Sequence, residues 1–107
     1  MSKYETTKVR YFQNSRYMVG FNAYITKDGK EIAEASHDGD CVVYTVRYLG
    51  GDTHERITNQ ADFLAWADKV IQPKRGTKAD RYNYQVMLET DALDYLLDQH
   101  DAKATGK

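Results

Sequence analysis

The sequence is poor in cysteine and proline, and it has no long apolar run. Its 107 residues include one cysteine, Cys41, and one proline, Pro73. A single cysteine cannot form an intramolecular disulfide, which excludes the disulfide scaffolds of small secreted domains. The longest continuous apolar run is residues 63–67, far short of the ~20 residues that cross a bilayer. No apolar signal segment begins the chain, so we expect a cytoplasmic protein without membrane contact.

Signatures of catalysis are also missing. The sequence has no GxxxxGK[ST] loop, no GxGxxG, no HExxH and no CxxC, which removes the strong local motifs for nucleotide, metal and redox chemistry. Cys41 begins an apolar segment, and this favours a buried, unreactive thiol over a nucleophile. We expect neither enzymatic activity nor a cofactor.

Histidines and carboxylates in two turns form the best candidate for a metal site. His37, Asp38 and Asp40 lie in one turn, and His54 with its acidic neighbours lies in the other. Their oxygen and nitrogen ligands would converge if the two turns lay at the same end of the sheet. Asp-Gly and Gly-Asp pairs are also what tight turns require. The role in tight turns is favoured over metal binding, and no metal is expected.

Charge is balanced in total and segregated along the chain. The formal net charge is −1, from 15 bases and 16 acids. Residues 1–16 hold four bases against one acid, and residues 74–81 do the same. Residues 28–40 hold five acids against one base, and residues 89–101 hold five acids and no lysine or arginine. Such polarised fields steer association and select partners.

The first half of the chain predicts strands separated by turns. The Asp28-Gly29 pair favours a type I′ hairpin, because both central residues need positive φ, and Asp38-Gly39 marks a further turn. One parity of residues 16–26 is apolar, as in a half-buried strand: Tyr17, Val19, Phe21, Ala23 and Ile25. Strands are expected at residues 8–12, 16–26, 31–36, 41–49 and 54–57. The segment 41–49, apolar on both parities, is expected in the centre of the sheet.

The period changes in the second half. Asn59 is the expected N-cap of a helix that Pro73 ends, and its apolar stripe is Phe63, Leu64, Ala67, Val70 and Ile71. A basic loop then leads to a strand at 82–88, after which Thr90 caps a last helix carrying Leu93, Leu96 and Leu97. The prediction is an α+β fold with a single antiparallel sheet of about five to six strands and two helices, in the order βββββαβα. Residues 1–101 form the expected single domain, and 102–107 a flexible tail.

Nine tyrosines and the acidic runs point to contact rather than catalysis. Exposed tyrosines on a sheet anchor protein interfaces. We expect a small non-enzymatic module that inhibits a larger protein or nucleoprotein complex by docking on its basic surface. The expected acidic contacts are Glu31, Glu34, Asp38, Asp40, Asp91, Asp94 and Asp98, with Tyr24, Tyr44 and Tyr48 as anchors.

In its size, its Asp-Gly turns (Asp28-Gly29 and Asp38-Gly39) and its acidic runs, the chain resembles in kind small phage-encoded antagonists such as anti-CRISPR proteins. The likeness is one of format, with no shared motif. It implies an inhibitor that acts in the host cytoplasm.

The alternative is a domain that binds single-stranded nucleic acid, whose bases stack on tyrosines while cations contact phosphates. The residues expected to serve it, besides Tyr44 and Tyr48, are Arg10, Arg16, Lys74, Arg75, Lys78, Tyr82 and Tyr84. A homodimer is also possible through an exposed sheet edge, for which the polar strand 31–36 is the expected candidate.

Overall fold

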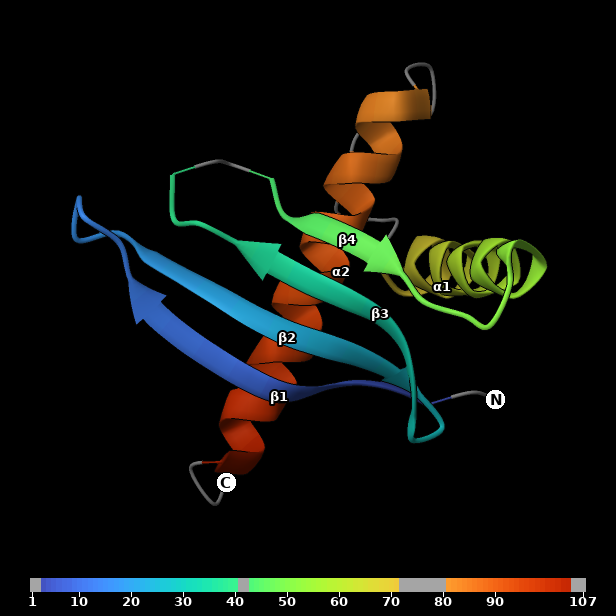
Figure 1. The fold of residues 1–107 in the computed structure, drawn as a ribbon, viewed down its shortest axis with the longest axis horizontal. Helices are drawn as coiled ribbons and strands as arrows, with labels where there is room; N and C mark the ends of the chain where they lie inside the picture. Colours follow the sequence, from blue (N-terminus) through green and yellow to red (C-terminus); the bar gives the residue numbers. More distant parts are fainter. Residues whose placement is uncertain (1–2, 41–42, 72–80, 105–107) are drawn as a thin grey trace.

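One antiparallel sheet and two helices make up the protein in a computed structural model that describes residues 3–40, 43–71 and 81–104, with backbone only at 81–83 and 104. The strands are β1 (Tyr4–Gln13), β2 (Val19–Lys27), β3 (Lys30–His37) and β4 (Thr45–Tyr48), and they lie in the sheet in chain order. The helices α1 (Thr53–Ile71) and α2 (Arg81–Ala104) pack on one face of the sheet. The other face is open (Figure 1).

The predicted α+β class, with one antiparallel sheet and two helices, is confirmed. Two of the predicted strands, 54–57 and 82–88, are wrong, because both segments are helical. The Asp-Gly hairpin between β2 and β3 is as expected, with φ of 52° at Asp28 and 89° at Gly29.

Helix α1 begins six residues before the predicted cap at Asn59. The Asp52 carboxylate accepts a hydrogen bond from the backbone N–H of Glu55 at 2.8 Å, and the Glu55 side chain accepts one from Gly51 N–H at 2.5 Å. This reciprocal pair is a capping box one residue wider than usual. Asn59 instead donates to the carbonyl of Leu49 at 2.8 Å, which ties the helix to the end of the sheet.

Residues 82–88, predicted as a strand, form part of helix α2. Its buried residues are spaced as on one face of a helix: Leu88, Ala92, Leu93, Leu96 and Leu97. Thr90, predicted as a cap, lies inside this helix, where its hydroxyl donates to the carbonyl of Val86 at 3.0 Å. The helix continues to Ala104, so residues 102–104 of the predicted tail are helical, and 105–107 lie outside the described residues.

The order of the strands corrects two further predictions. β4 lies at the edge of the sheet rather than in its centre, and β3, predicted as an edge, lies between β2 and β4. β3 is interior because it pairs with β2 along one edge and with β4 along the other, and its Ile32, Ala33 and Ala35 are buried in the core. Cys41 and the predicted helix end at Pro73 lie outside the described residues.

The core lies between the sheet and the two helices. Phe21, Ala23 and Ile25 of β2 are buried, as their parity predicts, although Tyr17 and Val19 of the same parity are exposed. From α1 the core takes Phe63, Ala67 and Ile71, with Leu64, Trp66 and Val70 partly buried beside them. The predicted stripe of this helix is therefore confirmed.

Candidate functional site

Four aspartates lie along one side of α2: Asp91, Asp94, Asp98 and Asp101. Their spacing of three, four and three residues places them within about 80° of helix circumference and along about 15 Å of its length. Asp94, Asp98 and Asp101 are exposed and Asp91 is half-buried. We call this row the acidic helix face. It joins three aspartates singled out from the sequence with Asp101, which was not among the predicted contacts.

Tyrosine hydroxyls hold two of these carboxylates in place. The Tyr44 hydroxyl donates to Asp94 Oδ1 at 2.5 Å, and the Tyr11 hydroxyl donates to Asp101 at 3.0 Å from Oδ2 and 3.2 Å from Oδ1. Burial and the neighbouring carboxylate raise the pKa of Tyr11 to about 12, and the same two causes raise the pKa of Tyr44. Both phenols therefore stay protonated donors at neutral pH.

An aromatic cluster behind the acidic helix face fixes the two tyrosines. Tyr11 pairs with Phe21 in the β1–β2 register, so both side chains point to the helix side of the sheet. The Tyr44 ring packs edge-on against Phe21 at 4.9 Å and against His37 at 4.8 Å between ring centres. Its backbone N–H donates to the Thr90 hydroxyl of α2 at 3.1 Å. The carboxylates are thus held by contacts from both the sheet and the loop before β4.

The other predicted acidic contacts lie elsewhere. Glu31 forms an ion pair with Lys8 at 2.8 Å, and Glu34 pairs with Arg47 across β3 and β4. Asp38 and Asp40 lie in the loop after β3, outside both the open face and the acidic helix face. The structure therefore divides the predicted acidic set among three places, and only its α2 members form a row.

The remaining predicted anchors differ in their surroundings. The Tyr48 hydroxyl donates to Glu89 of α2 between the sheet and the helix. Burial raises the pKa of both groups. Tyr24 lies on the open face of the sheet, where the Lys8 ammonium sits 5.2 Å from its ring centre. Of the three anchors, Tyr44 alone contacts the acidic helix face.

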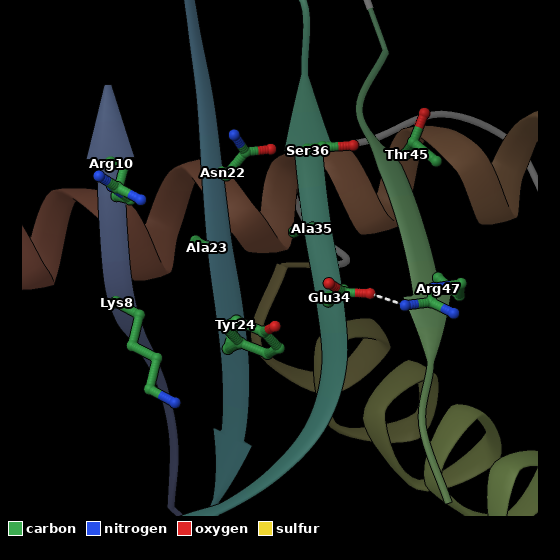
Figure 2. Close-up of a pocket in the computed structure, with 10 residues that line it drawn as sticks. All are labelled: Lys8, Arg10, Asn22, Ala23, Tyr24, Glu34, Ala35, Ser36, Thr45 and Arg47. Atoms are coloured by element: carbon green, nitrogen blue, oxygen red, sulfur yellow. Dashed lines mark hydrogen bonds and ion pairs between the residues drawn. The ribbon is translucent and has the colours of Figure 1, made fainter. Parts of the chain in front are cut away.

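A shallow hollow of about 640 Å³ occupies the open face of the sheet (Figure 2). Cross-strand neighbours line it in two rows. One row is polar, and its members are Arg10, Asn22, Ser36 and Thr45. The other contains Tyr24, Glu34 and Arg47, with Lys8 beside Tyr24. Because Lys8 and Arg47 pair with carboxylates, Arg10 is the cation of this hollow for which the described residues supply no ion pair.

The residues of the nucleic-acid alternative are dispersed. Arg10 lies in the hollow and Arg16 in the turn between β1 and β2. Tyr84 is helical, and its hydroxyl donates to Asp68 of α1. Lys74, Arg75 and Lys78 lie outside the described residues, as does the side chain of Tyr82. Tyr24 therefore lies on the open face of the sheet, whereas the hydroxyls of Tyr44, Tyr48 and Tyr84 bind carboxylates of the two helices.

The histidines of the candidate metal cluster are far apart in the topology. His37 ends β3 beside the start of β4, whereas His54 follows the end of β4 in the first turn of α1. The two turns thus lie at opposite ends of β4. Within residues 3–40, 43–71 and 81–103, no group of three histidine, cysteine or acidic side chains could hold a metal ion.

Comparisons with known proteins leave the fold and the acidic helix face as the basis for assigning function. No family model, curated protein or solved structure matches the chain. Neither of the two helices, as far as they are described, is apolar over a length sufficient to span a membrane.

Proposed function

We propose that the protein is a small non-enzymatic interaction module that docks the acidic helix face on a basic surface of a larger protein or nucleoprotein complex. The observation that carries this proposal is the row of four aspartates on one side of α2, two of them held by tyrosine hydroxyls. It unites on one surface the two features, acidic groups and tyrosine, that the sequence offers for binding.

Rigidity favours this row as a binding surface. Association costs free energy for every side chain that becomes ordered at the interface, about 0.5–1.5 kcal/mol each. Asp94 and Asp101 are already oriented by Tyr44 and Tyr11, so less ordering remains when a partner binds. A row of carboxylates on one side of a helix also attracts a basic partner over distance and accelerates its encounter.

The spacing of the charges suits a competitor of nucleic acid. Four carboxylates over about 15 Å of helix give one charge per ~5 Å, against one per ~3.4 Å for each strand of a DNA duplex. A basic surface that binds phosphates can therefore accept this face in their place. The protein would then act as an antagonist that blocks such a surface, an action of the kind performed by phage-encoded anti-CRISPR proteins.

Two matched variants test this function. Asp94→Asn/Asp98→Asn/Asp101→Asn neutralises the three exposed aspartates of the acidic helix face and keeps acceptors for both tyrosines. Glu31→Gln/Glu34→Gln/Glu55→Gln neutralises three acids elsewhere, and each variant changes the net charge from −1 to +2. Each is used, beside the wild type, to capture partners from the native host after nuclease treatment, with quantitative mass spectrometry as the measurement.

We expect the first variant to capture at least tenfold less of a protein partner than the wild type does, while the second variant captures as much as the wild type. Equal loss in both would show that only total charge matters and would contradict the proposal. Recovery of nucleic acid in place of protein, before nuclease treatment, would favour the alternative function instead.

A further inference from the structure

The turn between β1 and β2 exposes three consecutive apolar side chains. Tyr17, Met18 and Val19 are 79%, 52% and 60% exposed, respectively. We call these three residues the apolar tip. Ordinary surfaces expose single apolar residues, whereas contiguous ones mark interaction sites. Figure 1 shows this turn projecting from the sheet, beyond the part that α2 covers.

The side chain of Asn14 braces the backbone of the apolar tip through four hydrogen bonds. Its side-chain oxygen accepts hydrogen bonds from the backbone N–H groups of Arg16 at 2.8 Å and Met18 at 3.1 Å. Its amide nitrogen donates to the Asp38 carbonyl at 2.8 Å and to Asp40 Oδ1 at 3.1 Å. The turn is thereby fastened to the loop after β3.

One residue of the apolar tip also has an unusual backbone conformation. Tyr17 adopts a φ of 63°, a left-handed conformation that is rare for an aromatic residue and costs free energy. The Asn14 bonds keep this conformation, and in it the ring is 79% exposed. An exposed aromatic side chain on an ordered backbone suits an interface anchor, because binding then has to order the side chain but not the turn.

One residue of the apolar tip, Val19, lies on the same side of the sheet as the acidic helix face. Val19 lies two residues before Phe21 on β2, so its side chain points to the helix side of the sheet. Tyr11, the partner of Phe21 in β1, is 50% exposed on that same side and donates to Asp101 of α2. Tyr11 therefore connects an apolar patch at the end of the hairpin with a carboxylate row on the helix.

We propose that the apolar tip is the anchor of the interface whose charged part is the acidic helix face, and that the partner is a protein segment in which apolar side chains accompany lysine or arginine. This inference rests on the proposed function and specifies the chemistry of the partner. Complementarity of charge selects the basic residues, and the exposed tyrosine, methionine and valine select the apolar ones.

The two parts contribute to binding in different ways. The acidic helix face acts through long-range attraction, so its contribution decreases with salt and affects the association rate. The apolar tip acts through buried area, so its contribution is nearly independent of salt and affects the dissociation rate. Burial of one leucine against the tip is worth about tenfold in affinity, since it contributes ~1.5 kcal/mol or more.

The test uses two synthetic probes and fold-compatible variants. One probe is a short lysine-rich peptide with leucines at its centre, and the other has serines in their place. The tip variant is Tyr17→Asn/Met18→Gln/Val19→Thr: asparagine tolerates positive φ, and the other two changes conserve shape. The control is Ile57→Gln, because Ile57 of α1 is 58% exposed away from the tip.

Affinities come from fluorescence anisotropy at low and high salt, and the location of binding from amide chemical shifts. We expect the leucine peptide to bind the wild type at least tenfold more tightly than the serine peptide, with shifts at residues 11–19 and 94–101. The tip variant should reduce this advantage to less than about twofold, whereas the control should preserve it.

Each other outcome overturns a defined part of the reasoning. Equal binding of the two peptides, with shifts on α2 alone, would refute the apolar anchor and leave the proposed function intact. A loss of the leucine advantage in the Ile57→Gln control as well would also refute it. Failure of both peptides to bind the wild type at low salt would contradict the proposed function itself.

Discussion

Replacing Asn14 by alanine tests whether the hairpin turn is preorganised. The variant removes two acceptor bonds to the backbone N–H groups of Arg16 and Met18 and two donor bonds to the loop after β3. A protein hydrogen bond contributes about 0.5–1.5 kcal/mol net. Because water replaces part of what is lost at an exposed turn, we expect Asn14→Ala to cost about 1–3 kcal/mol rather than the full sum for four bonds.

Two measurements check this expectation. The melting temperature should fall by about 4–8 °C for each kcal/mol lost. Hydrogen exchange at the Arg16 and Met18 amides should accelerate by more than the global loss of stability explains, because the turn opens locally. The affinity for the leucine peptide should fall as well, although Asn14 itself lies behind the exposed side chains.

Two further variants make the result specific. Ser15→Ala changes an exposed residue of the same turn and should shift the melting temperature by less than about 4 °C, as expected for a change of less than about 0.5 kcal/mol. Asn14→Asp keeps the acceptors and loses the donors, so it should protect both amides while it weakens the tie to Asp40. Unprotected Arg16 and Met18 amides in the wild type would refute the reasoning at its first step.

Three other predictions address contacts that define the fold. Asp52→Ala removes the α1 cap and should cost about 1 kcal/mol, measured as a lower urea midpoint with an unchanged m-value; an unchanged midpoint would contradict it. Burial raises the pKa of Glu89, so the folded state binds its proton more tightly and stability decreases as pH rises above the ordinary value of 4.5. Glu89→Gln should therefore be more stable than the wild type at neutral pH, and its stability should decrease less as the pH rises. Parallel curves of Tm against pH for the two proteins would contradict this prediction. A Cβ at Gly20 would lie 2.3 Å from the His37 carbonyl oxygen, so Gly20→Ala should destabilise by about 1–3 kcal/mol, and a wild-type thermal melt would exclude the clash.

Elements fixed by local periodicity could be predicted from the sequence. The stripe of α1 and the buried parity of β2 each follow from the spacing of apolar residues within one segment. The Asp28-Gly29 hairpin is equally local, because both residues adopt the positive φ that this pair favours. In each case the residues that decide the structure are neighbours in the chain.

The sequence contains a local signal for the start of α1, which the predicted cap at Asn59 does not match. Asp52 and Glu55 have the spacing of a capping box, a signal independent of the apolar stripe that begins later at Phe63. This signal outweighs Asn59 as the cap.

The strand prediction at 82–88 is wrong for a different reason. The alternation of Tyr84, Val86 and Leu88 is short, and the longer helical spacing of the leucines that follow outweighs it.

The order of the strands depends on contacts that no segment contains. The apolar residues at 43–49 predict a central strand, but within the described part of this segment the strand covers Thr45–Tyr48, and its partner is β3. Their apolar side chains pack against the helices instead, as Val46 and Tyr48 do. A segment apolar on both parities therefore indicates burial without saying whether sheet or helix supplies it.

The same dependence on long-range contacts decides which acidic run becomes a surface. Glu31 and Glu34 lie in a run that holds as many acids as that of α2, yet the sheet brings Lys8 and Arg47 beside them, and these ion pairs compensate their charge. The aspartates of α2 instead line one side of the helix, and two of them, Asp94 and Asp101, accept hydrogen bonds from the phenols of Tyr44 and Tyr11. Those phenols are 50 and 90 residues away from the carboxylates they hold. Whether an acidic run becomes a binding surface therefore depends on which side chains the fold brings beside it, and the run of α2 is the one whose aspartates form a row along a single helix face.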